Sequence, residues 1–600
     1  MPEYLAPGVY VEETSFRARS IEGVGTSTTA FVGPTRRGPS TGLPELVTSL
    51  PDFVRIYGGL DDLEFSPGTK TLNYVAHAAR AYFDNGGRRL YVMRTIGANA
   101  APATAVLREG DASVSARFRA RFPGAAGSGR VILRESSRPV ARRQTLEMAP
   151  ADSLLRLRFE GPDSDDNREE LYRKLASGLW QQADGLTNLD PAIFDSDGLL
   201  VTAGPGVAGV GGADLLTLAV TAEDATGFSQ TWEDMGYGAA HTRSIHSVLK
   251  QNPDRRADAL TQLIWADIGS SVSPFDLRQA ATEAIPSGAG ERVLQLGNGR
   301  DGGEPIAGSE DQAGTYAAAL AQLSNLEDIS IVAAPGSSAL GQAQAITNAL
   351  IAHAERRRAY RIAVIDAPPD RIPGDIRQDR GKIDSKYAAL YYPWVVVANP
   401  LAVPGRDDIP KEIALPPSGF VCGIYARNDS LRGVHKAPAN EVVTGALRFA
   451  YDVNFAQQEL LNPLGINCLR YLSGRGYRVW GARLASSDPE WKYVSDRRYF
   501  NYLEASIDRS TQWAVFEPNG DSLWSNIRQT ISDFLYNEWR NDALLGSTPE
   551  AAFFVRCDRS TMTQNDLDNG RLVCLIGVAI LRPAEFVIFR IGQKTADASS

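Results

Sequence analysis

The feature that most constrains the fold is an alternation of apolar runs and helical patterns between residues 315 and 398. Ile329–Ala333 and Ile362–Asp366 read as buried strands, and residues 339–356 between them carry apolar side chains at helical spacing. A strand, a helix and a second strand in this order form a βαβ unit with parallel strands and a covering helix. A helix over 316–323 precedes the unit and a further strand, Trp394–Ala398, follows it. The sequence therefore predicts an α/β core.

A similar pattern occurs near the start of the chain. A helical pattern with apolar positions from Tyr74 to Tyr82 is closed by Asn85-Gly86-Gly87, and the buried strand Leu90–Met93 follows. An apolar run at Ala30–Val32 comes before it, after a Gly-, Ser- and Thr-rich stretch at 20–29 that reads as a tether. We therefore expect one discontinuous core interrupted by an insertion.

The expected insertion, residues 101 to about 290, is mostly β. Residues 101–158 carry 11 Arg against 5 Asp and Glu. In the run 117–122 the arginines alternate with apolar residues. This pattern indicates that the arginines lie on the solvent-exposed face of a sheet and does not favour a nucleic-acid-binding groove. The Gly-rich run 204–212 is typical of a loop or hairpin tip.

The last hundred residues are dense in predicted elements. A helix begins near Arg497, a second helix carries an apolar stripe from Leu523 to Trp539, and Phe553–Cys557 reads as a strand. Leu572–Leu581 is predicted to be a central strand. The final apolar run, Phe586–Ile591, follows Pro583 and is apolar on both faces, so its own domain or another chain must cover it.

Composition bounds the class of protein. A chain of 600 residues exceeds what one core serves, so about three or four domains are expected. The net charge of -9 argues against a nucleic-acid partner. We expect no secretory signal and no membrane insertion, because the longest apolar run has about half of the ~20 residues that a membrane helix needs. The chain is expected to fold in the cytoplasm with reduced cysteines.

Two sequence patterns resemble nucleotide- or metal-binding motifs, but neither has all the features that such a site requires. Gly297–Gly302 fits G-x-G-x-x-G, but no helix start follows it, so a glycine-rich turn is predicted. Asp566–Gly570 lacks the ligand pattern of a calcium loop and reads as a hairpin turn. Neither the four cysteines nor the five histidines have metal-site spacing. We expect no catalytic residue, no cofactor and no metal.

Several phrases, in this order along the chain, resemble the contractile phage tail sheath proteins, a family that includes sheaths of pyocin-like particles and contractile injection systems. The resemblance covers about the first 95 residues and residues 290 onward. The phrases are YLAPGVYVEE (4–13), TAFVG (29–33), NGGRRLYVMRT (85–95), LRGVHKAPAN (431–440), LNPLGI (461–466), RRYFNYLEASI (497–507) and the run 513–591.

The resemblance implies a structural subunit that polymerises as a helical contractile tube around an inner tail tube. It implies partners that are further copies of the chain, in rings expected to be hexameric, the inner tube protein, and baseplate and terminator or cap proteins. It also implies that two end segments pair within the sheets of neighbouring subunits. The matching positions are Val9, Tyr10 and Val11 near the start and Phe586, Val587, Ile588, Phe589 and Ile591 near the end.

The same reading divides the chain into six parts. They are an N-terminal exchange arm (1–30), a first core part (31–100), the outward-facing insertion (101–290), the α/β core (291–480), a C-terminal domain facing the tube (481–583) and the C-terminal exchange strand and tail (584–600). The expected place of assembly is the bacterial or infected-host cytoplasm. Two other classes stay open: a nucleotide-binding α/β enzyme built on 329–366, and a β-rich surface or receptor-binding protein built on the insertion.

Overall fold

The computed structural model describes residues 20–66, 68–160, 167–201, 209–283 and 290–590. Its main sheet has nine strands in the order β2-β5-β1-β16-β17-β18-β23-β24-β21. The pairings from β5 through β1, β16, β17 and β18 to β23 are all parallel, which confirms the predicted α/β class. The strands are β1 (Thr29–Pro34), β2 (Leu46–Val47), β5 (Leu90–Thr95), β16 (Ile331–Ala333), β17 (Ile362–Asp366), β18 (Ala388–Tyr392), β21 (Glu441–Val442), β23 (Ile466–Leu472) and β24 (Gly476–Val479).

The core is discontinuous in sequence, as expected. Ala30 of β1 lies beside Tyr91 of β5 on one side and beside Val332 of β16 on the other. One sheet is thus assembled from chain segments that precede and follow the insertion. Its strands read as unbroken apolar runs because helices cover both faces.

Alternate residues of each strand enter two separate apolar clusters. Phe31 and Val364 pack on one face with helices α1, α2 and α10. Ala30 and Ile365 pack on the other face with helices α7, α8 and α9. The covering helices are α1 (Leu50–Tyr57), α2 (Tyr74–Asp84), α7 (Tyr316–Leu323), α8 (Ala343–Glu355), α9 (Pro373–Arg380) and α10 (Ser418–Arg432).

The strand predicted at 394–398 does not belong to this sheet. Val395–Ala398 forms β19 of a separate antiparallel sheet with β20 (Glu412–Leu415) and β22 (Arg448–Phe449). The core strand is β18 instead, whose tyrosines hid its buried character. The Tyr391 hydroxyl lies 2.6 Å from that of Tyr425, and the Tyr392 hydroxyl donates to the Arg371 carbonyl at 2.8 Å. A buried tyrosine is tolerated when its hydroxyl is bonded in this way.

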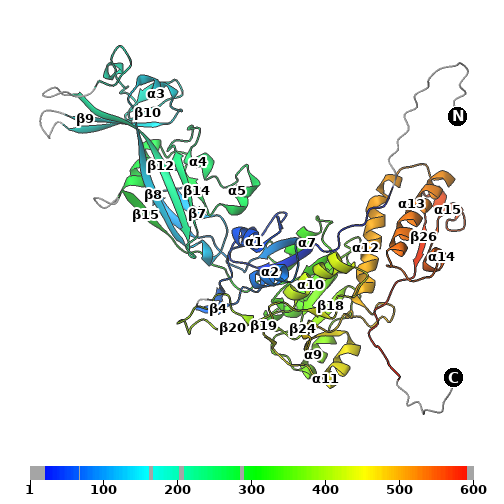
Figure 1. Ribbon diagram of the computed structural model, residues 1–600. Coiled ribbons are helices and arrows are strands. Elements are labelled where there is room, and N and C mark those ends of the chain that lie inside the picture. The colour runs from blue at the N-terminus through cyan, green and yellow to red at the C-terminus, as the bar shows by residue number, and fades with distance from the viewer. Residues whose placement is uncertain (1–19, 67, 161–166, 202–208, 284–289, 591–600) are drawn as a thin grey trace, which may run out of the picture.

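The insertion is mostly β and extends to one side of the core in Figure 1. Its larger sheet has seven strands with β12 (Gly209–Asp224) between β8 (Gly129–Pro139) and β9 (Leu154–Glu160). A smaller sheet pairs β7 (Ala116–Ala120) with β14 (Ile264–Ile268) and β6 (Thr104–Arg108). There Arg119 donates to Asp267 at 2.9 Å, so the arginine-rich strand carries ion pairs on its wet face. The remaining elements are β10 (Arg168–Lys174), β11 (Trp180–Gln181), β13 (Ser229–Met235), β15 (Glu291–Leu296), α3 (Arg143–Met148), α4 (Ile245–Val248), α5 (Arg256–Thr261) and α6 (Pro274–Thr282).

The glycine-rich turn 297–302 joins the insertion to the core. Thr104 and Gly297 exchange two backbone hydrogen bonds of 2.8 and 3.0 Å, so the outgoing and returning segments lie side by side. A Cβ added at Gly97 would lie 1.7 Å from the Gly303 carbonyl oxygen. The glycines therefore permit close backbone packing at a junction, and the next helix, α7, begins only at Tyr316.

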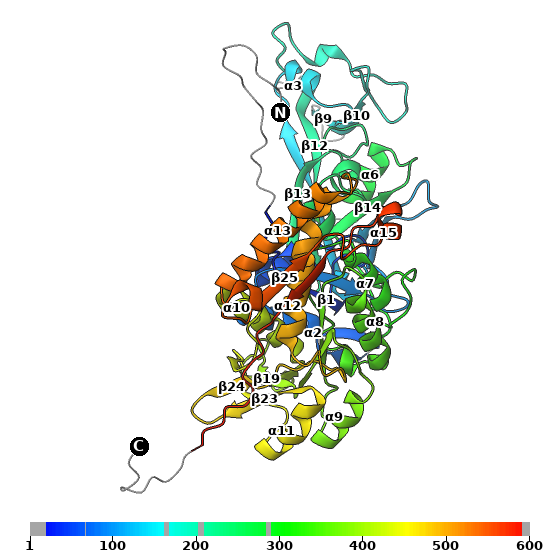
Figure 2. The same cartoon turned by 90° about the vertical axis from the view of Figure 1, so that its right-hand side faces the viewer.

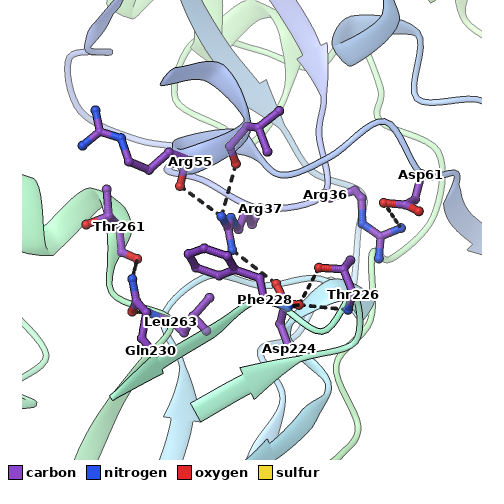
Figure 3. A network of polar contacts seen from close by, with 11 residues as sticks. Arg36, Arg37, Arg55, Asp61, Asp224, Thr226, Phe228, Gln230, Thr261 and Leu263 are labelled. Carbon is purple, nitrogen blue, oxygen red and sulfur yellow. Dashed lines mark hydrogen bonds and ion pairs between the residues drawn. The ribbon is translucent and has the colours of Figure 1, made fainter. Parts of the chain in front are cut away.

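A polar cluster around Arg37 fastens the insertion to the core a second time (Figure 3). Arg37 follows β1, and its guanidinium donates to the last carbonyls of α1, those of Val54 and Arg55, at 3.2 and 3.1 Å. It also donates to Asp224 of the β12–β13 turn at 3.3 Å and lies 4.9 Å from the centre of the Phe228 ring. Because Arg37 joins two layers through one side chain, it limits rotation between them.

A C-terminal layer packs against the other side of the core (Figure 2). Its helices α12 and α13 cover an antiparallel pair of strands, β25 and β26, which residues 557–574 connect; we call this pair the β25–β26 hairpin. The elements are α12 (Val494–Ser510), α13 (Asp521–Arg540), α14 (Pro549–Ala552), β25 (Phe553–Arg556), α15 (Gln564–Asp568) and β26 (Leu575–Val578).

Two expectations for this layer are wrong. The predicted central strand 572–581 forms a strand only at Leu575–Val578, within a sheet of two strands, because the layer supplies one partner strand. The predicted hairpin turn at 566–570 is instead the end of helix α15, whose start is fixed by a capping box between Thr563 and Asp566.

Candidate interaction surfaces

The sequence predicts that residues 20–29 act as a flexible tether that lets the N-terminal arm extend to a neighbouring subunit. This expectation is wrong for residues 24–26, which are hydrogen-bonded to the body of the protein. The Val24 amide donates to Ser506 Oγ on α12 at 3.1 Å. Thr26 Oγ1 donates to Asp429 on α10 at 2.6 Å. The stretch holds only two large apolar residues, Ile21 and Val24. Ile21 packs against the apolar cluster of the C-terminal layer, and backbone and hydroxyl groups of the stretch bond to helix side chains. Residues 24–26 are therefore fixed to helices α10 and α12.

The anchor for this segment is a buried ion pair. Arg498 on α12 donates to both oxygens of Asp429, at 2.8 and 2.5 Å, and to the Thr26 carbonyl at 3.1 Å. The guanidinium also lies 4.7 Å from the centre of the Tyr425 ring. Burial alone would lower the pKa of Arg498, but Asp429 outweighs it and the pKa is raised. Such a pair is costly to break from one side, so it fixes where the N-terminal segment leaves the body.

The C-terminal segment crosses the same layer and is held at three points. After β26 the Leu545 amide donates to the Ala579 carbonyl at 2.8 Å. Arg582 then lies 3.7 Å from the buried carboxylate of Asp496, whose pKa burial raises to about 6. Three residues later, Glu585 enters a set of four polar side chains. This path takes the chain from the hairpin to the far edge of the main sheet.

Glu585 is the last fixed point, and we call its contacts the Glu585 clamp. Arg483 donates to its two oxygens at 2.8 and 2.6 Å, Asn462 donates at 2.7 Å and Tyr493 donates at 3.0 Å. Lys492 lies farther away, at 3.8 Å. Burial alone would raise the pKa of Glu585, but the hydrogen bonds from Arg483, Asn462 and Tyr493 outweigh it and the pKa is lowered. The carboxylate is therefore ionised and held at neutral pH.

Beyond the clamp the chain is exposed. Phe586, Val587, Ile588 and Phe589 are 70%, 68%, 79% and 83% exposed, and among the described residues they belong to no strand. Four consecutive large apolar side chains in water are unfavourable, and a surface patch of this kind marks an interaction site. The other predicted exchange residues, Val9, Tyr10, Val11 and Ile591, lie outside the described residues.

The β25–β26 hairpin has the chemistry of an acceptor for an added strand. Within the described part of the chain neither strand has a second partner, so each keeps a free edge. Phe554 and Leu575 are each 51% exposed, and the Phe554 ring lies over Gly577, where a Cβ would come within 2.2 Å of it. An isolated pair of strands is only marginally stable and gains from further strands.

An open groove of about 730 Å3 runs beside β26. Ile576 and Val578 of β26 line it together with Leu503 of α12, whereas no residue of β25 does. The exposed Arg357, at its rim, forms no hydrogen bond or ion pair with any described residue. The groove thus offers apolar side chains below a free strand edge and a basic group at its margin.

The part of the chain that the structure describes has neither a metal-binding cluster nor a membrane-spanning helix. No group of three or more His, Cys, Asp or Glu side chains is placed to hold a metal ion there. No described helix is long and apolar enough to cross a membrane.

The clamps could not be found from sequence. Arg483 and Glu585 are 102 residues apart, and Arg498 and Asp429 are 69 apart. Each is by itself an ordinary charged residue. The apolar run Phe586–Phe589, in contrast, can be recognised from sequence alone, although in the described chain it is exposed and does not form the strand that the sequence predicts.

Comparison with known proteins gives family matches over the second half of the chain. Residues 311–483 match the family model of the phage tail sheath protein central domain, and residues 486–594 match that of the phage tail sheath C-terminal domain. A putative prophage major tail sheath protein of Pseudomonas aeruginosa (strain UCBPP-PA14) is 25% identical over 267 residues, which are 44% of this chain and 64% of that protein. The chain thus spans less than two thirds of this curated relative.

Two solved structures share the fold over nearly the whole chain. The sheath complex of the extracellular contractile injection system PVC, in its contracted state, has a TM-score of 0.52 at 19% identity and covers 99% of each chain. The contracted helical sheath of the anti-feeding prophage has a TM-score of 0.51 at 20% identity and covers 98% of this chain and 100% of that one.

Proposed function

Because this chain belongs to the phage tail sheath family, we propose that it is a structural subunit that polymerises into a helical, contractile sheath around an inner tube. The observation that carries the proposal is the run Phe586–Phe589, four exposed apolar residues that begin directly after the Glu585 clamp. A partner must cover them, and further copies of the chain offer free strand edges.

Strand exchange between copies provides the link. The C-terminal strand of one copy adds to the β25–β26 hairpin of another, and residues 9–11 of a further copy add to the remaining edge. Backbone hydrogen bonds supply affinity, and alternate side chains enter the apolar surface below. Each large apolar side chain that becomes buried contributes about 1.5–3 kcal/mol.

Contraction would then move subunits that stay joined through these strands. The energy is stored in the extended lattice during assembly and released on a trigger, so no nucleotide is consumed. The rings would be hexameric, with the insertion outward and the polar face of α13 toward the inner tube. Baseplate and cap proteins would close the two ends, and assembly would take place in the bacterial cytoplasm.

A truncation series tests the proposal. Removal of residues 586–600 leaves the Glu585 clamp intact and takes away the exposed strand. We expect a folded subunit that forms no long tubes in negative-stain electron microscopy, whereas the full chain forms striated tubes.

Removal of residues 592–600 is the matched control. It retains the whole strand and should leave tube length unchanged. Tubes of normal length from the shorter variant would contradict strand exchange, and small discrete particles from the full chain would contradict the sheath function itself.

A further inference from the structure

A groove lined by both apolar and charged side chains, among them Arg432, Glu459 and Asp542, lies at the base of the C-terminal segment, apart from the hairpin edges. It has a volume of about 1030 Å3. We call it the arm-base groove and define it by the residues Phe455, Asn462, Trp480, Ala584, Phe586 and Val587. Its three largest exposed apolar side chains are Phe455, Phe586 and Val587, at 69%, 70% and 68%.

We propose that the arm-base groove is a body-to-body interface that receives the C-terminal layer of a second copy of this chain. The inference rests on the proposed strand exchange and adds a contact that the exchange alone does not require. It commits to one occupant, a second copy, whose exposed Phe554 and Leu575 lie on one face of its β25–β26 pair and are the complementary apolar surface.

No flexible linker separates the Glu585 clamp from the exposed apolar run. Glu585 is held by Arg483, Asn462 and Tyr493, and the exposed strand begins at the next residue. Paired strands lie about 4.8 Å apart and packed layers about 10 Å apart. A hairpin that pairs with Phe586–Phe589 therefore brings its own body to the mouth of the groove.

The apolar surface of the C-terminal run continues into the arm-base groove. Phe586 and Val587 belong both to the strand and to the lining of the groove, so a partner that covers one also meets the other. Phe455 opens helix α11 (Phe455–Leu461), whose only buried side chain is Leu461. The Phe455 ring has no packing role that would explain its place on the surface, and a second copy would supply one.

The proposed N-terminal exchange segment, residues 9–11, is separated from the body of the protein by a longer stretch of chain. Nine peptide steps separate Val11 from Ser20, which can span at most about 30 Å. Only the C-terminal link is short enough to force two bodies into contact, which singles out the arm-base groove.

The substitution Phe455→Asp tests the inference. Phe455 lies outside the strand, the clamp and the hairpin, and its exposure means that folding should not depend on it. We expect an unchanged melting temperature and a rise of about tenfold or more in the protein concentration needed for tubes, because burial of one phenylalanine is worth that much. Phe455→Leu should assemble nearly as the unmodified chain does. Leu186→Asp, at an 84% exposed apolar residue of the insertion, is the matched control and should have no effect.

A second measurement does not depend on loss of assembly. The photoreactive residue benzoylphenylalanine at position 455 should give, in assembled sheaths, a product that joins two copies and maps by mass spectrometry to residues 521–580 of the second copy. Products within one copy only, products with another protein, or equal assembly of Phe455→Asp would overturn the inference. If the unmodified chain forms no tubes, the proposed function fails and the inference fails with it.

Discussion

The buried carboxyl of Asp366 ties the end of β17 to the start of α10. It accepts hydrogen bonds from the amide and the hydroxyl of Ser418, both at 2.7 Å. Burial raises its pKa to about 7 in spite of these bonds. No described basic side chain forms an ion pair with it, so the folded protein holds a proton there at pH values where the unfolded chain has lost it.

This gives a prediction of pH dependence. Between the unfolded pKa of about 4 and the folded value of about 7, the native state binds more protons, so the free energy of unfolding falls as pH rises, by about 1.4 kcal/mol for each unit of pKa difference. Asp366→Asn removes this loss. We expect the melting temperature of the variant, relative to that of the unmodified chain, to increase from pH 5 to pH 8.

Asp384→Asn provides the control, because Asp384 is bonded in the same way by the amide and hydroxyl of Ser487, at 2.8 and 2.7 Å, but is exposed. The hydrogen bonds from Ser487 lower its pKa. Its stabilising effect is therefore complete above pH 4, and the difference between this variant and the unmodified chain should be constant from pH 5 to pH 8. The same constancy for Asp366→Asn would refute the raised pKa.

Residue roles such as these could not be predicted from sequence. Asp366 ends an apolar run, and nothing beside it in the chain reveals Ser418 as its partner. The two apolar faces of Phe586–Phe589 could be predicted, because strand alternation depends only on neighbouring residues. The Glu585 clamp that makes this strand short and fixed depends on residues from other segments.

At the scale of single elements, the Glu585 clamp should hold the C-terminal segment in place and contribute little to the stability of the rest of the fold. Arg483→Met removes its bidentate partner and leaves Glu585 with weaker bonds. We expect faster amide hydrogen exchange in residues 581–590, little change elsewhere and shorter tubes. Hydrogen exchange with mass spectrometry measures this directly.

Lys492→Met is the matched control, since Lys492 lies 3.8 Å from Glu585 with its side chain 42% exposed. An exposed pair of this kind contributes little. Equal exchange rates in the two variants would show that the clamp does not hold the segment.

Helices and buried strands were predicted well where a local pattern decides them, as at 316–323 and 362–366. The misassignments arose where tertiary context decides. β18 carries two tyrosines that other elements satisfy, and β19 is as apolar as a core strand although it lies in a small side sheet. Helix α15 is held by a capping box in a stretch that resembles a turn.

At the scale of the whole molecule, the insertion should be separable. Its apolar clusters share no buried residue with those of the core. Thr104 and Gly297 are hydrogen-bonded neighbours, so replacing residues 105–296 by a two-residue Asn-Gly turn closes the chain without strain.

We expect the shortened chain to fold and to form tubes of smaller outer diameter. Electron microscopy measures the diameter. Arg37→Ala should lower the melting temperature less in the shortened chain than in the full chain, because Asp224 and Phe228 are already absent and only the bonds to the Val54 and Arg55 carbonyls are left to lose. Aggregation of the shortened chain would show that the core depends on the insertion.

The discontinuous sheet has a consequence during synthesis. β1 is paired on one side by β16, which begins 236 residues after β5 ends. At about 5–20 residues per second, roughly 10–50 seconds pass between the appearance of these strands at the ribosome. During that interval β1 and β5 present an unpaired apolar edge while the insertion folds. The nascent chain is therefore a natural client for chaperones that shield strand edges until translation delivers the missing neighbour.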